Sequence, residues 1–180
     1  IYKNGETLAS IADYVSDQTI DFGLGEDYSD FPGVLTFRGN NFRDGGSYGY
    51  AELRDEEFGT YWNAPTGALT SSDGYTWTGN GWTGQPLIAQ WPKELRQHMN
   101  MYDWAKEKDT LTEVIYASMD GYVYFYELTS GSKTRDALNL GYTFKGAGAL
   151  DPRGYPVLYV GSGYNSARGG SHAFIISLLD

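Results

Sequence analysis

The sequence has 180 residues, 24 glycines, 16 tyrosines and a formal net charge of -10. This length suits one domain with a sizeable core. The 13 Lys and Arg residues form no basic run, which excludes the positive footprint of a nucleic-acid-binding protein. Cysteine is absent, which excludes disulfides and thiolate metal sites, and no apolar stretch is long enough to span a bilayer.

The N-terminal region, residues 1–33, is predicted to be a helix and linker extension. Leu8, Ile11 and Val15 have helical spacing, which predicts a short helix. The acidic stretch "DFGLGEDYSDFPG" follows. It lacks the D-x-D-x-D-G pattern of a calcium loop, so calcium binding there is unsupported and a solvated connector is expected.

Residues 34–180 have a different pattern, in which short apolar runs alternate with Gly-rich turns. This pattern is typical of an all-β repeat architecture. The polar stretch "KELRQHMNMYDWAKEKD" interrupts it. We expect a helical turn around Glu94–Met99 in this stretch, followed by an exposed loop.

One unit recurs within this region. Ile115–Ser118 aligns with Leu158–Gly161 at a lag of 43 residues, Tyr124–Leu128 with Phe174–Leu178 at a lag of 50, and Pro86–Ile88 with Gly148–Leu150. Short antiparallel strands that recur in this order predict the blades of a β-propeller, because one blade cannot bury both of its faces alone. The alternative is a β-sandwich in which two hairpins are similar by chance.

The stretch "IYASMDGYVYFYELTSGSKTR" resembles the PQQ-like β-propeller repeat, whose blades carry "VYVGSxDGxLYALDxxTGKxxW". Asp120 and Gly121 fall on the Asp-Gly turn of that family, and Gly131 falls on the Gly of its Thr-Gly turn. "FRGNNFRDGGSYG" resembles the segment before its first blade, and "GALDPRGYPVLYVGSG" resembles the start of another blade. The resemblance covers about residues 34–180. It implies four-stranded antiparallel blades, with about two blades and an incoming strand in this incomplete propeller.

The sequence departs from the family at two positions. Arg135 stands where the family has a Trp that docks neighbouring blades, and Ser132 stands where it has a Lys. The quinone-dependent dehydrogenases of this fold also use adjacent cysteines and a calcium site. We therefore expect neither PQQ nor any other cofactor, and no metal site.

Two blades are fewer than a closed propeller needs. We therefore expect the remaining blades to come from the same longer protein or from other copies of the chain. The acidic, Tyr-rich and Cys-free composition favours a bacterial protein that is secreted or held at the cell envelope.

Candidate site residues are of two kinds. Asp120, Gly121, Gly131 and Asp151 are expected to be structural turn residues, because Asp and Gly are turn formers. No catalytic residue is predicted. The ligand-binding candidates are loop aromatic and Arg side chains, which suit sugar or protein recognition: Trp77, Trp82, Tyr164 and Arg168. For Trp77, Trp82 and Trp91, packing between blades is the alternative.

The expected function is therefore non-enzymatic binding or scaffolding, with a protein or a glycan as the partner and without a membrane span. The alternative is a propeller hydrolase that acts on polysaccharide through carboxylates at the central channel. Both expectations depend on analogy of fold.

Overall fold

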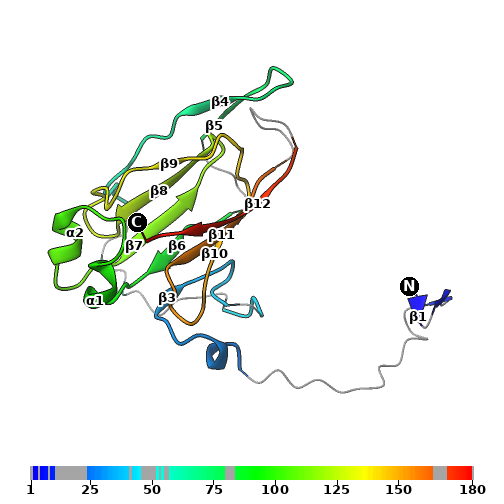
Figure 1. The fold of residues 1–180 in the computed structure, drawn as a ribbon, viewed down its shortest axis with the longest axis horizontal. Helices are drawn as coiled ribbons and strands as arrows, with labels where there is room; N and C mark the ends of the chain where they lie inside the picture. Colours follow the sequence, from blue (N-terminus) through cyan, green and yellow to red (C-terminus); the bar gives the residue numbers. More distant parts are fainter. Residues whose placement is uncertain are drawn as a thin grey trace.

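The computed structural model describes residues 2–3, 5–7, 9–10, 24–40, 42–45, 52, 54, 57–79, 84–163 and 170–179. Over these residues the fold is mostly β, with antiparallel sheets and two short α-helices (Figure 1). This confirms the all-β part of the predicted fold class. The helix expected over residues 8–15 lies largely outside the described residues.

A five-stranded antiparallel sheet forms the larger layer. Its strand order is β3-β6-β7-β8-β9, and the strands are β3 (Gly33–Val34), β6 (Leu87–Ala89), β7 (Glu113–Ala117), β8 (Tyr122–Glu127) and β9 (Leu138–Asn139). In its centre Ile115 pairs with both Leu87 and Phe125.

β3 crosses the predicted boundary after residue 33, and the ring of Phe31 packs on the ring of Trp91 with centroids 4.8 Å apart. The core thus extends at least to residue 31.

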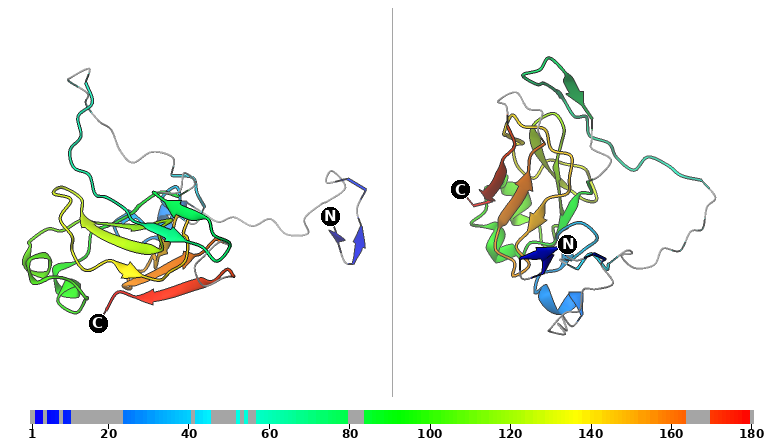
Figure 2. Two further views of the ribbon diagram at one scale, coloured as in Figure 1. Left: turned by 90° about the horizontal axis from the view of Figure 1, so that it is seen from above. Right: turned by 90° about the vertical axis from the view of Figure 1, so that its right-hand side faces the viewer.

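A three-stranded antiparallel sheet forms the second layer. It consists of β10 (Ala149–Leu150), β11 (Val157–Gly161) and β12 (Ala173–Ser177), in that order. Outside both sheets lie the hairpin of β4 (Ala68–Thr70) and β5 (Thr76–Thr78), the pair β1 (Tyr2–Lys3) and β2 (Glu6–Thr7), and the 3₁₀ helix η2 (Gly25–Tyr28). Figure 2 shows β10, β11 and β12 in orange and red beside the green strands of the larger sheet.

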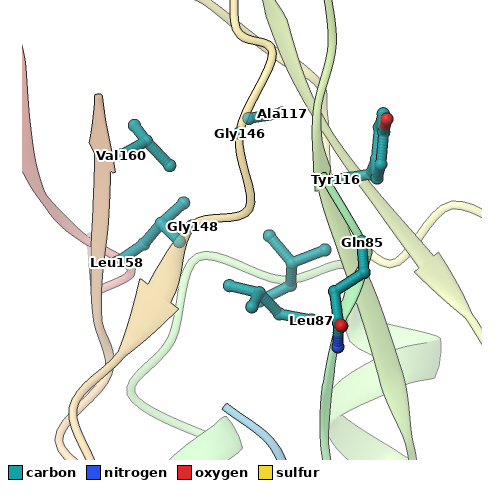
Figure 3. Close-up of a pocket in the computed structure, with 9 residues that line it drawn as sticks. Gln85, Leu87, Tyr116, Ala117, Gly146, Gly148, Leu158 and Val160 are labelled. Atoms are coloured by element: carbon teal, nitrogen blue, oxygen red, sulfur yellow. The ribbon is translucent and has the colours of Figure 1, made fainter. Parts of the chain in front are cut away.

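The core lies between the two sheets. Side chains alternate between the faces of a strand, so Ile115, Val123 and Phe125 share one face of the larger sheet and are at most 3% exposed. The smaller sheet contributes Leu158 and Val160 to the same apolar cluster. Figure 3 shows both side chains pointing toward the larger sheet, while Tyr116 lies on its far side.

The polar stretch after β6 is folded more tightly than its sequence predicts. The helical turn expected around Glu94–Met99 is present as α1 (Lys93–Arg96), but the expected exposed loop contains a second helix, α2 (Asp103–Glu107). The Arg96 guanidinium is fully buried and donates hydrogen bonds to the carbonyls of Ala105 and Lys108. These contacts hold the two helices together, so the loop expectation was wrong.

Backbone hydrogen bonds show which residues of the two sheets are equivalent. Ser118 N donates to Tyr122 O over 2.9 Å, and Ser162 N donates to His172 O over 2.8 Å. These bonds close the β7–β8 and β11–β12 hairpins in the same way. By these bonds, each residue of β8 is equivalent to the residue 50 positions later on β12, as the sequence predicts. Each residue of β7, however, is equivalent to the residue 44 positions later on β11.

The predicted lag of 43 residues is therefore wrong by one. It matches Ile115 with Leu158, which is the pairing that residue similarity favours, whereas the hydrogen bonds match Val114 with Leu158. A second bond at the open end agrees, because Leu128 N donates to Thr112 O and Leu178 N donates to Pro156 O. A shift of one residue turns every side chain to the opposite face, so the correction decides which faces are equivalent.

The corrected lag relates two different faces of the molecule. The face of the smaller sheet that packs in the core carries Leu158, Val160, Phe174 and Ile176. Its equivalent on the larger sheet carries Val114, Tyr116, Tyr124 and Tyr126. That equivalent face points away from the core between the sheets, and it is where the candidate site lies.

Candidate functional site

The outer face of β7 and β8 is lined mainly with tyrosines, and we call it the tyrosine face. Its residues are Val114, Tyr116, Tyr122, Tyr124 and Tyr126. The rings of Tyr122 and Tyr124 stack with centroids 5.8 Å apart, and those of Tyr124 and Tyr126 lie 6.1 Å apart and almost parallel, at 12°. This stacking follows from the i, i+2 spacing on β8, which puts successive tyrosines on one face.

Residues 62–67 cross the tyrosine face as an extended segment, which we call the strap. At one end Trp62 Nε1 donates a hydrogen bond of 2.8 Å to Leu128 O, and its ring lies 5.8 Å from the ring of Tyr126. At the other end Gly67 N donates to Asp120 Oδ2 over 2.6 Å. The strap is thus fastened at both ends to the β7–β8 hairpin.

A cleft of about 410 Å³ opens between the strap, the residues just before β6 and the tyrosine face. We call it the tyrosine cleft, and its walls come from Trp62, Ala64, Thr66, Gly84, Pro86, Val114, Tyr116, Tyr124 and Tyr126. Clefts of this size with mainly apolar and aromatic walls are typical of ligand sites.

Asp120 binds the Gly67 end of the strap. It is 1% exposed and accepts hydrogen bonds from the backbone N–H groups of Gly67 and Tyr122 and from the Tyr124 hydroxyl. Burial raises the pKa of Tyr124, and its hydrogen bond to Asp120 raises that pKa further. Burial and the charge of Asp120 also raise the pKa of Tyr126. Both hydroxyls therefore remain protonated, and the Tyr124 hydroxyl uses its one proton in the hydrogen bond to Asp120.

The predicted turn residues around β8 lie beside this cleft. Asp120 and Gly121 form the β7–β8 turn, where Gly121 has φ +90°. Gly131 has φ +68°, and a Cβ atom added to it would lie 2.7 Å from Cδ2 of Trp62. A larger residue at position 131 would therefore push the Trp62 ring away from Tyr126.

Asp151 lies at the end of β10, remote from the cleft walls. Its carboxylate accepts a hydrogen bond of 2.9 Å from the Arg153 backbone and also binds the Arg153 guanidinium. Gly154 N donates to Asp151 O. The arrangement closes a local turn between β10 and β11.

Of the four predicted ligand-binding residues, only Trp77 lies within the described residues, and it is not among the residues that line the tyrosine cleft. Trp77 lies on β5, where the Lys145 ammonium sits 4.1 Å from its ring centroid. Trp82, Tyr164 and Arg168 lie outside the described residues. Trp91 is 2% exposed and donates to Glu113 over 2.8 Å, so it packs in the core.

Sequence reasoning missed the residues that line the cleft. The signal for Tyr124 and Tyr126 is the alternation in "GYVYFYE", which predicts one tyrosine-lined face of a strand. Tyr116 follows from the same alternation on β7. Nothing in the local sequence indicates that Trp62, more than 50 residues earlier, would cross that face.

The buried carboxylates of the larger sheet are held by internal partners. Glu113 binds the Arg135 guanidinium, with 3.0 Å between Oε2 and Nη2, and also accepts hydrogen bonds from Trp91 and Thr134. Glu127 pairs with the Lys108 ammonium over 3.1 Å. Over the described ranges, no group of three or more His, Asp or Glu side chains is arranged to hold a metal ion.

Comparison of the chain with protein-family models, curated proteins and solved structures gave no match. In the part of the chain that the structure describes, no helix combines the length and the apolarity needed to cross a membrane.

Proposed function

We propose that the chain is a non-enzymatic binding or scaffolding module whose tyrosine cleft receives an extended segment of a protein partner. The observation that carries this proposal is a contrast between equivalent positions. Tyr116, Tyr124 and Tyr126 stand where the smaller sheet has Val160, Phe174 and Ile176. The smaller sheet uses its apolar side chains to pack permanently against the larger one.

Tyrosine suits a surface that is covered only part of the time. Its ring gives contact area when a partner is bound, and its hydroxyl remains compatible with water when the partner is absent. A permanently dry contact would not need hydroxyl groups at these positions. The strap covers only part of the tyrosine face and leaves the cleft open.

A protein segment fits the cleft better than a glycan does. The described residues that line the cleft include no charged or amide side chain, so few side-chain groups are available to bind the hydroxyls of a sugar. Tyr124 also has its ring faces directed at Tyr122 and Tyr126 and its hydroxyl bonded to Asp120, so it presents the edge of its ring. An extended peptide offers apolar side chains to the ring edges and a carbonyl oxygen to the Tyr126 hydroxyl.

The proposed setting is a PQQ-like β-propeller of a secreted or cell-envelope bacterial protein, of which this chain would be a part. In this setting the tyrosine face would be covered by the strap and the partner segment and not by another blade. The shared hairpin hydrogen bonds of the two sheets support a repeated unit. The stacking of non-equivalent faces supports it as well, because successive blades of a propeller are related by rotation about an axis. A sandwich of two mirrored hairpins would instead bring equivalent faces together.

The alternative function, a hydrolase that acts on polysaccharide, needs a pair of carboxylates flanking the scissile bond. Glu113, Glu127, Asp120 and Asp151 all bind internal partners. Within the part of the chain that the structure describes, no carboxylate lines the tyrosine cleft. These observations favour binding over hydrolysis.

The proposal is tested with a phage-displayed library of random peptides selected on the whole chain. Apolar extended peptides should be enriched, and Tyr126→Ala should weaken their binding about tenfold, as expected for an aromatic anchor. Tyr155→Ala is the matched control, because Tyr155 is 58% exposed and lies outside the cleft. Its binding should equal that of the unmodified chain.

Two outcomes would overturn the proposal. Selection could yield no peptide, or the selected peptides could bind the Tyr126→Ala variant as tightly as the unmodified chain. A panel of oligosaccharides is screened in parallel. An oligosaccharide that binds intact and depends on Tyr126 would make the partner a glycan, and a cleaved one would favour the hydrolase.

A further inference from the structure

The floor of the tyrosine cleft limits how it can bind the backbone of a partner. This floor is the face of a sheet, and the backbone N–H and C=O groups of a strand point along the sheet toward neighbouring strands. β7 pairs with β6 on one side and with β8 on the other. A partner segment that lies on the tyrosine face therefore cannot form a ladder of backbone hydrogen bonds with it.

The strap is a poor template for such a ladder as well. It contains Pro65, which has no backbone N–H to donate. Side chains alternate along the strap, and Trp62, Ala64 and Thr66 line the cleft. Asn63 and Pro65 lie between them and are exposed. A partner in the cleft is thus contacted mainly by side chains.

Tyr126 supplies a hydrogen-bond donor for a partner carbonyl. Burial and the charge of Asp120 raise its pKa and keep it protonated, and its hydroxyl has no hydrogen-bond partner among the described residues. A hydroxyl oxygen can also accept one N–H, but the described lining residues include no carboxylate or side-chain amide to accept more. Because a buried N–H without an acceptor opposes binding, the cleft favours a segment that has carbonyls but few N–H groups.

Aromatic rings form much of the lining of the cleft, from Trp62, Tyr116, Tyr124 and Tyr126. The rings of Tyr124 and Tyr126 are 12° from parallel, and the ring of Trp62 is tilted by 43° from that of Tyr126. Proline packs an apolar ring without losing rotamer freedom, and a polyproline II segment is already extended before it binds. Aromatic-lined grooves suit such segments for this reason.

We propose that the segment bound in the tyrosine cleft is proline-rich, adopts a polyproline II helix and is flanked by Lys or Arg. This inference rests on the proposed function and names the class of its partner. Proline provides a carbonyl oxygen for Tyr126 without adding an N–H group. The basic flanks follow from the net charge of -10, which attracts a positively charged partner. The partner extends the contact that the strap already makes with the tyrosine face.

The probe is a fluorescent peptide with the sequence Arg-Pro-Pro-Leu-Pro-Pro-Leu-Pro-Arg, and fluorescence anisotropy measures its binding to the whole chain. Three residues make one turn of polyproline II, so the two leucines share one face. The control peptide has every proline replaced by alanine, which keeps length and charge but restores N–H groups and conformational freedom. The probe should bind saturably, and the control at least about tenfold more weakly.

Ala64→Trp tests whether the probe enters the cleft. Ala64 lines the cleft from the strap, which lies outside both sheets, so a large ring there fills the cleft without disturbing the core. Binding of the probe should weaken at least about tenfold. Asn63→Trp is the matched control, because Asn63 is the neighbouring residue on the strap, is exposed and does not line the cleft. It should bind the probe as the unmodified chain does.

Tyr126→Phe tests the hydrogen bond to the partner carbonyl. It keeps the ring and removes the hydroxyl, so the probe should bind about fivefold more weakly. Tyr75→Phe makes the same chemical change at a residue that is 68% exposed on the separate β4–β5 hairpin, and it should leave binding unchanged.

The proposal is overturned if the probe binds no more tightly than its alanine control, or if Ala64→Trp leaves its binding unchanged. Its failure is distinguishable from failure of the proposed function. If peptides selected from the phage library bind through Tyr126 while the proline-rich probe does not bind, the proposed function stands and the partner class is wrong. If neither kind of peptide binds, both proposals are overturned.

Discussion

Phe125 and Ile175 occupy equivalent positions in the two sheets, yet 3% of Phe125 is exposed against 76% of Ile175. Both lie in apolar strands and both alternate with neighbours that face the other way. The difference arises because the smaller sheet packs over Phe125, while no described residue covers Ile175. The comparison teaches that a strand's own pattern predicts its two faces but not which face will be covered.

The two sheets also differ in buried charge. Glu113 of the larger sheet corresponds to Val157 of the smaller one at the lag of 44 residues. Glu113 and Arg135 form a buried ion pair whose side chains are 0% and 5% exposed. Burial lowers the pKa of Arg135, and the attraction of Glu113 opposes that shift. This pair fastens the segment 132–139 along β8, and the smaller sheet has no counterpart of it among the described residues.

The largest expected effect tests the difference between Phe125 and Ile175. Phe125→Ala should lower the free energy of unfolding by about 3–5 kcal/mol, because it removes a buried ring and leaves a cavity. Ile175→Ala should change it by less than about 0.5 kcal/mol, because the side chain is exposed. Urea unfolding of both variants measures the two changes in unfolding free energy. Equal effects would show that the two positions are not covered as described.

A smaller effect is expected when the buried ion pair is broken. Glu113→Gln keeps the shape of the side chain but removes the charge that compensates Arg135, and it should cost about 2–3 kcal/mol of unfolding free energy. Val157→Ala at the equivalent position is the control and should cost about 1 kcal/mol. If Glu113→Gln were neutral, the pair would not be what fastens segment 132–139.

The third expected effect depends on pH. Burial opposes ionisation of Glu127, but hydrogen bonds from Ser130 and the Lys108 ammonium outweigh it and lower its pKa from 4.5 to about 2. A lowered carboxyl pKa stabilises the folded state above the unfolded pKa. This contribution should be complete above pH 4.5 and should be lost as the pH falls toward about 2.

Glu127→Gln is the variant that isolates this contribution. The difference in unfolding free energy between the unmodified chain and the variant should be largest above pH 4.5 and should shrink in acid. The equivalent position of the smaller sheet holds Ser177, so Ser177→Ala should leave the acid dependence unchanged. A difference that stays constant across the acid range would contradict the role of Lys108 and Ser130.

Much of the fold could be predicted from local pattern. The turn at Asp120 and Gly121 and the strands on either side of it follow from short-range preferences. The alignment of β7 with β11 was wrong by one residue because Ile115-Tyr116 and Leu158-Tyr159 match by residue type. The hydrogen bonds that close the two hairpins match Val114 with Leu158 instead, and similarity of residue type does not reveal them.

The tyrosine cleft was less predictable than the strands that form its floor. The alternation on β8 indicates a tyrosine face, but the cleft also needs Trp62 and the strap, which are fastened to Leu128 and Asp120. These contacts join residues more than 50 positions apart. Long-range contacts of this kind leave no periodic signal in the sequence.

The sequence by itself determined that this protein is built from short antiparallel strands, because alternation and turn preferences act over a few neighbouring residues. It also determined that each strand would have two different faces. The tertiary structure decided which faces meet, since that depends on the packing of whole sheets. Packing buried Phe125, left Ile175 exposed, and turned the tyrosines of β8 toward an open cleft.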